Sequence, residues 1–297
     1  MKNLKKILSL VLALAMALSL MTAAFAADAS DYKDYSKVTY NEAVDVMTAA
    51  GIFQGNNGNF DPAGTLTREQ AAKIITYMLV GQSQADKLTT TIAPYSDVAA
   101  SRWSAGAIAY CKNEGIIAGT GNGKFSPTAE LTGLQFAKML LVALGYDATI
   151  EKLEGASWAI NTSKLALGDA DLDNGMKDVS LSNVLTREQA AQMAFNAMKA
   201  TLVEYEDKGD NITVGGITIN TGASKATPVT SKVKAEATNI SDDKVANSDA
   251  YTVEFAEKYC KDLKLKSDTN DLKQPTDKWT YKSKTVGTYA VDADNTA

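Results

Sequence analysis

Three arginines carry the clearest chemical signal in this chain of 297 residues. Arginine occurs only at Arg68, Arg102 and Arg187, although lysine and arginine together number 30. Arg68 and Arg187 lie within the same five-residue segment, LTREQ, at 66–70 and 185–189. A guanidinium group can bind a carboxylate through two parallel hydrogen bonds, which an ammonium group cannot do. The placement therefore predicts contact with a carboxylate, either on a ligand or on a neighbouring Asp or Glu of the protein.

Two tryptophans, Trp103 and Trp158, each come just before or at the start of a helix-like run. An indole ring can anchor a hydrophobic core or stack on a sugar ring. Both functions remain open from the sequence, and we expect at least partial burial of the two rings.

Catalytic chemistry has little support in the sequence. The chain contains no histidine, which removes Ser-His-Asp and Cys-His nucleophile systems and histidine-bound zinc. A pair of carboxylates that hydrolyses a glycosidic bond remains chemically open. Asp169, Asp171 and Asp173 alternate as in a calcium loop, but EF-hand spacing would place the bidentate acid at Ser180. We predict no catalytic residue, no cofactor and no metal site.

The charge and cysteine content narrow the class of partner. The formal net charge is −5, and nucleic-acid binding requires a basic face, so we expect no nucleic-acid partner. Cys111 and Cys260 are the only cysteines. They exclude a disulfide framework and leave a single bridge open. Cys111 lies on the apolar phase of a predicted helix, which favours a buried thiol.

The first 26 residues have the composition of a secretory signal peptide. Lys2, Lys5 and Lys6 precede an apolar stretch, and Ala24-Phe25-Ala26 is a small-x-small cleavage site. An uncleaved membrane anchor is the alternative, because the apolar stretch is near the lower length limit for a spanning helix. We favour cleavage before Ala27, which leaves a secreted chain with no membrane segment.

The LTREQ segments belong to a repeated unit. A degraded copy, LTGLQ, lies between them at 131–135. Each copy starts an apolar run with helical spacing, and a second helix-like run precedes a glycine-rich loop before it. We therefore predict three helix-loop-helix repeats, at residues 32–80, 95–145 and 151–200. The threonine of each copy, with the glutamine three positions later, is typical of a capping box: Thr67 with Gln70, Thr132 with Gln135, and Thr186 with Gln189.

The second repeat resembles the S-layer homology (SLH) domain family. It contains YSDV at 95–98, Trp103, GIIAG at 115–119, GKFSP at 123–127 and LTGLQ at 131–135. The resemblance extends over residues 32–200 as three copies after a signal peptide. It implies a pseudo-threefold helical bundle whose grooves hold an anionic secondary polymer attached to peptidoglycan, often ending in a pyruvylated amino sugar.

The resemblance also implies residue roles. Arg68 and Arg187 would contact the ketal carboxylate. The grooves would be shaped by Asp97, Trp103, Trp158 and the loop glycines Gly55 and Gly119. Two departures reduce the expected number of working grooves below three: Gly133 replaces the second arginine, and the first repeat lacks its tryptophan.

Residues 206–297 differ in composition from the repeats and resemble no family. Residues 211–214 and 217–220 alternate around Gly215-Gly216, which predicts a hairpin. Residues 253–265 have the pattern of one amphipathic helix, and 279–291 are strand-like. We expect a smaller β-rich or α+β region here, belonging to a chain that continues beyond it or ends as a small domain.

These observations predict a mainly α protein that attaches, without catalysis, to the secondary polysaccharide of a cell wall from outside the cell. Two alternatives remain open. In one, the repeats tether a cell-surface enzyme whose catalytic part lies in or beyond residues 206–297. In the other, the chain is a structural protein that assembles into a surface layer.

Overall fold

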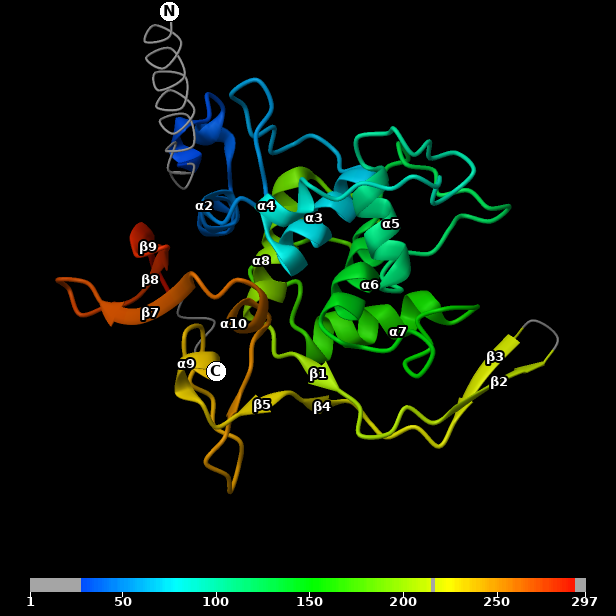
Figure 1. The fold of residues 1–297 in the computed structure, drawn as a ribbon. Helices are drawn as coiled ribbons and strands as arrows, with labels where there is room; N and C mark the ends of the chain where they lie inside the picture. The colour runs from blue at the N-terminus through cyan, green and yellow to red at the C-terminus, as the bar shows by residue number, and fades with distance from the viewer. Residues whose placement is uncertain (1–27, 215–216, 292–297) are drawn as a thin grey trace, which may run out of the picture.

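The computed structural model describes residues 28–214 and 217–291. The predicted signal peptide lies outside these residues. Within them, no helix is long and apolar enough to cross a membrane. Helices fill the first two-thirds of the described chain and short β-sheets fill the last third (Figure 1).

The helical part consists of paired helices joined by glycine-containing loops. Its α-helices are α2 (Asn41–Ala49), α3 (Arg68–Val80), α4 (Gln82–Ala85), α5 (Ala105–Asn113), α6 (Gly133–Ala143), α7 (Trp158–Lys164) and α8 (Arg187–Lys199). The remaining helical segments are η1 (Ala29–Asp31), η2 (Tyr35–Lys37) and the π-helical turn η3 (Leu165–Asp169), which extends α7.

Each long second helix begins with the predicted capping box. Thr67, Thr132 and Thr186 each accept a hydrogen bond from the backbone amide three residues ahead. The side-chain oxygen of the glutamine at that position accepts a hydrogen bond from the threonine amide, with N–O distances of 2.9–3.0 Å. Because two otherwise unpaired amides are satisfied locally, the starts of α3, α6 and α8 are encoded within a few residues. The capping prediction is confirmed.

The second helix of each repeat packs on the first helix of the next repeat. α3 packs on α5, α6 on α7, and α8 on α2. Backbone contacts between the residues just before these second helices link the repeats in the same cyclic order. The Leu131 amide donates to the Leu66 carbonyl, the Leu185 amide donates to the Leu131 carbonyl, and Thr186 forms an antiparallel bridge with Thr65. All three leucines are buried. The Leu-Thr segments at the starts of α3, α6 and α8 therefore meet in the interior, and each repeat contacts the next in a closed ring.

The C-terminal part contains four small sheets and two short helices. The strands are β1 (Val203–Glu204), β2 (Asp210–Val214), β3 (Ile217–Thr221), β4 (Thr227–Pro228), β5 (Thr230–Ser231), β6 (Tyr251–Thr252), β7 (Leu263–Thr269), β8 (Pro275–Tyr281) and β9 (Lys284–Ala290). The helices are α9 (Lys234–Ala237) and α10 (Phe255–Tyr259). All pairs are antiparallel: β1 with β4, β2 with β3, β5 with β6, and β7 with β8 and β9.

The structure corrects the predicted fold class. Helices account for 33% and strands for 19% of the molecule, so it is a mixed α and β protein and not a mainly α one. The difference arises after residue 200, where the predicted helix over 253–265 is also wrong. Only Phe255–Tyr259 is helical, and Leu263 begins the three-stranded sheet. An apolar run of this length suits a buried helix or a buried strand equally well, and pairing with β8 selects the strand.

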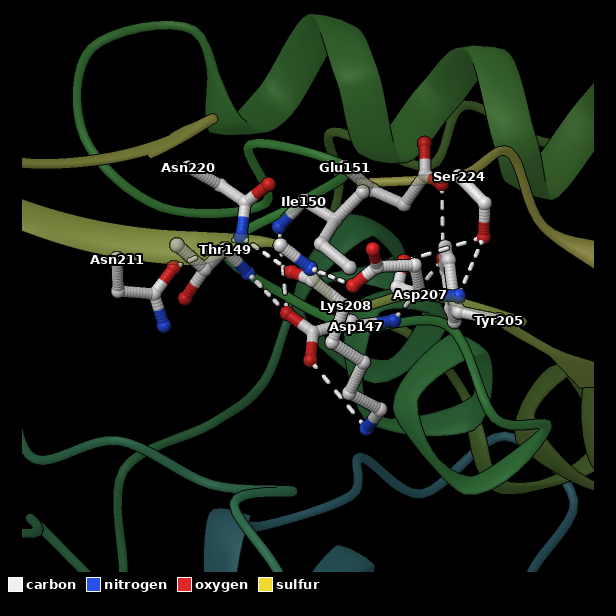
Figure 2. A network of polar contacts seen from close by, with 11 residues as sticks. Asp147, Thr149, Ile150, Glu151, Tyr205, Asp207, Lys208, Asn211, Asn220 and Ser224 are labelled. Atoms are coloured by element: carbon white, nitrogen blue, oxygen red, sulfur yellow. Dashed lines mark hydrogen bonds and ion pairs between the residues drawn. The ribbon is translucent and has the colours of Figure 1, made fainter. Parts of the chain in front are cut away.

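The hairpin prediction is confirmed. β2 pairs with β3 from Asp210 with Thr221 to Val214 with Ile217, while Gly215-Gly216 lies outside the described residues. The hairpin extends away from the helices (Figure 1). Its base is held against the α6–α7 connection by a polar network (Figure 2). There the Tyr205 hydroxyl donates to Glu151 at 2.8 Å and accepts from the Asp147 amide at 3.2 Å.

The three-stranded sheet shares one core with the helices. Trp279 of β8 is fully buried, and its ring meets Phe195 of α8 edge-on with centroids 5.3 Å apart. Its Nε1–H donates to the Glu42 carboxylate of α2 at 2.6 Å. Tyr289 of β9 donates to Asp45 of the same helix at 2.6 Å. The three-stranded sheet is therefore bound directly to the first and third repeats.

Candidate functional site

Arg68, at the first position of α3, holds the glycine-rich loop of the next repeat. Its Nε donates to the Phe125 carbonyl at 2.8 Å and its Nη2 to the Ala118 carbonyl at 3.0 Å. The guanidinium carbon lies 4.5 Å from the centre of the Phe125 ring, within the range of a cation–π interaction. Burial lowers the pKa of Arg68, although an arginine side chain keeps its charge in proteins.

Arg187 makes the same contacts one step around the cycle. From the start of α8 its Nε donates to the Phe60 carbonyl at 2.9 Å and its Nη2 to the Gln54 carbonyl at 3.1 Å. The guanidinium carbon lies 5.3 Å from the centre of the Phe60 ring. The arginines of the two LTREQ copies therefore bind a loop of the neighbouring repeat in the same way at two junctions.

Neither arginine pairs with a protein carboxylate within the described part of the chain. The bidentate pair forms instead at Arg102, whose Nε and Nη2 each lie 2.7 Å from a Glu69 oxygen. Sequence reasoning singled out the repeated arginines and missed this pair, because Glu69 and Arg102 belong to different repeats. Glu69 lies in the LTREQ copy itself, and that placement was the available signal.

Asp97 binds the backbone of the second-repeat loop that Arg68 also contacts. Its two carboxylate oxygens accept the amides of Phe125 and Ser126, both at 2.8 Å. Burial acts to raise the pKa of Asp97, but the two amide bonds outweigh it and hold the pKa below its ordinary value. Asp34 binds the amides of Phe60 and Asp61 in the first repeat in the same way. Asp34 was not predicted, although it precedes its helix much as Asp97 does.

The loop glycines permit close approach of a tyrosine. A Cβ on Gly119 would lie 2.7 Å from the Lys124 carbonyl oxygen and 3.1 Å from the Tyr95 ring. A Cβ on Gly55 would collide with the ring of Tyr32. Only glycine fits these positions without a shift of the backbone or of the ring.

Three of the predicted residues line one groove, here called the junction groove, of about 590 Å³. Arg68, Gly119 and Trp158 come from three different repeats. The groove is completed by Ile116, Ile117, Ala118, Thr120, Gln135, Lys138, Met139, Leu153, Glu154 and Gly155. It thus combines an indole, two cations and one acid, with Lys138 Nζ lying 3.6 Å from the Glu154 carboxylate.

Lys138 was missed by sequence reasoning. It lies six positions after the capping threonine, where the first repeat has Lys73. Aligning the three copies beyond the LTREQ segment would have found it. Lys73 instead pairs with Asp86 at 2.9 Å.

The other predicted residues lie elsewhere. Trp103 does not line the junction groove, and 58% of it is exposed, so the expected burial is wrong for this ring. Trp158 is partly buried, as expected. Arg187 and Gly55 belong to the junction between the third and first repeats. Among the described residues, no group of three or more acidic or cysteine side chains could hold a metal ion.

The junction between the second and third repeats lacks an arginine for a steric reason. Gly133 begins α6, and its amide donates to the Asn183 carbonyl at 3.0 Å. A Cβ on Gly133 would lie 2.7 Å from Leu181 Cα and 2.9 Å from its carbonyl oxygen. The third-repeat loop fills the volume that an arginine side chain would need.

Residues 31–72 and 94–137 match the S-layer homology domain. The match covers two segments; the third repeat, at 151–200, stays a prediction.

Similar proteins are bacterial surface proteins. A "Cell surface protein" of Thermoanaerobacter kivui is 28% identical over 249 residues, which are 83% of this chain and 31% of the relative. A "Surface layer protein" of Brevibacillus choshinensis is 26% identical over 71% of this chain and 18% of the relative. A "Surface-layer 125 kDa protein" of Lysinibacillus sphaericus is 30% identical over 56% of this chain and 15% of the relative.

The alignments span about a third or less of the length of these relatives. Together with the S-layer homology segments, they identify a cell-surface protein associated with the cell wall. They support cell-wall anchoring of a surface protein.

Proposed function

We propose that this chain anchors a surface protein to the cell wall by binding an anionic polymer attached to peptidoglycan, and that the junction groove is the binding site. The observation that carries the proposal is the convergence of Arg68, Lys138 and Trp158 on one groove in a chain with two S-layer homology segments. An indole suits a sugar ring, and the cations suit a carboxylate.

The arginine has donors available for such a ligand. Nε and Nη2 of Arg68 donate to protein carbonyls, and among the described residues Nη1 has no acceptor within the protein. Lys138, whose ammonium group lies 3.6 Å from the Glu154 carboxylate, is the second cation of the groove. Local cations are needed here, since the net charge of the chain repels an anionic polymer.

The test is co-sedimentation of the complete mature chain with purified sacculi, before and after chemical removal of the secondary polymer. We expect Trp158→Ala and Lys138→Gln to weaken binding about tenfold each, the loss of about 1.4 kcal/mol. Trp103→Ala and Lys87→Gln are matched controls outside the groove and should bind as the wild type does. Equal binding by the groove variants and their controls would contradict the proposed site, and equal binding to stripped sacculi would contradict the polymer.

Arginine variants are unsuited to this test. Because Arg68 and Arg187 hold loops of neighbouring repeats, their replacement would alter the fold together with any ligand contact.

The proposed function is non-catalytic. The chain has no histidine, and similar proteins are named as surface proteins. Incubation of the chain with sacculi should therefore release no soluble saccharide, and release above a heat-denatured control would favour a surface enzyme.

We also propose self-assembly as a second property, supported by the relatives named as surface-layer proteins. Sedimentation velocity at increasing protein concentration should show assemblies larger than the single chain. A constant sedimentation coefficient over the whole concentration range would argue against assembly by this chain.

A further inference from the structure

A second and larger groove, of about 800 Å³, lies between the first repeat and the C-terminal region. We call it the lateral groove. One wall is formed where α2 and α3 end, at Gly51 and Gly81. The opposite wall is formed by the end of α10 with the following loop, residues 258–262, and by the β8–β9 turn at residues 281 and 282. No residue is shared with the junction groove.

The walls of the lateral groove carry the side chains that suit a saccharide. Three half-buried tyrosines line it, Tyr32, Tyr259 and Tyr281, together with the buried Tyr77. Three glutamines, Gln54, Gln82 and Gln84, add amide donors and acceptors. Tyrosine rings provide an apolar face with a polar edge, and amides hydrogen-bond to sugar hydroxyls.

The rim of the lateral groove is positively charged, unlike the chain as a whole. Lys258, Lys261 and Lys282 line it together with one acid, Asp262, whereas the chain has a net charge of −5. All three lysines are exposed, and none forms an ion pair within the described residues. Two of the ammonium groups lie over tyrosines of the groove, Lys258 over Tyr259 and Lys282 over Tyr281, both at 5.2 Å from the ring centre.

We propose that the lateral groove binds an acidic saccharide, with Tyr32, Tyr259 and Tyr281 against the sugar rings and the three lysines around the carboxylates. The site exists only when the two parts of the chain are joined. The first repeat supplies Tyr32, Tyr77 and Gln54, and helix α4 after it supplies the other two glutamines. The C-terminal region supplies every lysine and the other two tyrosines. The S-layer homology segments by themselves therefore lack its charged half. This site is independent of the junction groove, and either one can fail without the other.

Isothermal titration calorimetry on the complete mature chain tests the proposal with three probes. Trigalacturonic acid supplies sugar rings and carboxylates, maltotriose supplies neutral sugar rings, and inorganic phosphate supplies charge alone. We expect binding of trigalacturonic acid at low ionic strength and much weaker binding of the other two probes.

The decisive variant is Lys258→Gln, Lys261→Gln and Lys282→Gln combined, which should weaken trigalacturonic acid binding about tenfold or more. The matched control combines Lys225→Gln, Lys232→Gln and Lys264→Gln. These lysines are also exposed and lie outside both grooves, so the change in net charge is identical. The control should bind as the wild type does, and both variants should keep the wild-type melting temperature because only exposed ends change.

Each other outcome overturns the proposal. Absence of trigalacturonic acid binding removes the site. Equal weakening in the control variant would mean that binding reflects net charge alone. Binding of phosphate as tight as that of trigalacturonic acid would reduce the groove to an anion site without sugar recognition. Trp158→Ala serves as an independent reference, because it should weaken sacculus binding while leaving binding of trigalacturonic acid unchanged.

Discussion

At the scale of single residues, the repeated arginines hold neighbouring repeats together through contacts within the protein. The Arg68 guanidinium donates to two backbone carbonyls of the next repeat and stacks on Phe125. A lysine could reach one carbonyl but could not span both, because its donors diverge from one nitrogen. The choice of arginine therefore has a structural reason that holds with or without a ligand.

Arg68→Lys and Arg187→Lys should each lower the free energy of unfolding by about 1–3 kcal/mol, because charge-assisted hydrogen bonds are lost. Urea denaturation followed by circular dichroism measures the change. Lys225→Gln, an exposed cation far from the junctions, should change stability by less than about 0.5 kcal/mol. Losses no larger than those of this control would show that the arginines do not hold the loops.

A buried acid predicts a pH dependence of stability. Glu254 is 2% exposed, and burial, followed by the neighbouring Glu257, raises the pKa of its carboxyl well above the ordinary 4.5. The folded protein then binds more protons than the unfolded chain, so the contribution of Glu254 to stability falls as pH rises from about 4.5 towards neutrality.

Glu254→Gln keeps an oxygen that can accept from Thr252 and removes the ionisation. Urea unfolding at about pH 5 and about pH 7.5 should show a smaller loss of stability with rising pH in this variant than in the wild type. Exposed Glu206 provides the control, since Glu206→Gln should leave the slope unchanged. Parallel pH profiles for wild type and Glu254→Gln would contradict the raised pKa.

At the scale of elements, the starts of the second helices combine a local signal with a contact between repeats. Each capping box satisfies amides within its own helix. The next amides, which no cap reaches, donate to loop carbonyls of another repeat: Arg68 to Ala129, Gly133 to Asn183, and Arg187 to Gly64. Helix formation and docking of the repeats are therefore coupled at the same few residues.

Thr67→Ala and Thr186→Ala should each cost about 1 kcal/mol of unfolding free energy through loss of the cap. Thermal or urea unfolding measures this, and Thr67→Ser should recover most of the loss because a hydroxyl is retained. Thr89→Ala, at an exposed loop position, is the matched control. Unchanged stability in both cap variants would refute the capping role.

Gly133→Ala tests the close approach at the start of α6. Alanine favours a helix by about 1 kcal/mol over glycine, but here the added Cβ would lie 2.7 Å from Leu181 Cα. We expect a net loss of about 1–3 kcal/mol. The control is Gly168→Ala, at a position where an added Cβ meets no atom within 4 Å. A stabilising effect at Gly133 like that expected at Gly168 would show that the junction is loose.

At the scale of the whole molecule, the C-terminal region behaves as part of the helical body. Trp279 fills the core beside Phe195 and bonds to Glu42, and the lateral groove needs both parts. A fragment that ends near residue 205 would expose Phe195 and leave Glu42 without its indole partner. Binding experiments therefore require the complete chain.

Trp279→Ala should destabilise the protein by about 3–5 kcal/mol, as expected for truncation of a fully buried aromatic side chain. Because the ring contacts a helix of the third repeat, the helical signal and the aromatic near-ultraviolet signal should shift together in urea. Leu272→Ala, at a residue that is 78% exposed, should have little effect. Loss of the near-ultraviolet signal at lower urea than the helical signal would show that the two parts unfold separately.

The sequence alone determined the features that depend on neighbouring residues. Capping boxes, loop glycines, the β2–β3 hairpin and the buried Cys111 thiol are all readable locally, because each rests on a pattern of a few positions. The resemblance to the S-layer homology family implied that Arg68, Gly119 and Trp158 shape grooves of one kind. The short helix and strand between 253 and 269 were not readable, since an apolar run is compatible with both.

The contacts across the cycle of repeats follow from the packing of distant segments and could not be predicted from the sequence. Arg102 finds its carboxylate on Glu69, 33 positions away, and Trp279 meets Glu42 across 237 positions. The exposure of Trp103 and the filling of the Gly133 junction by Leu181 are likewise consequences of packing. Such contacts depend on the fold of the whole chain. Two segments that pack together from distant parts of the sequence need not share any repeated pattern of residues, so neither segment reveals its partner.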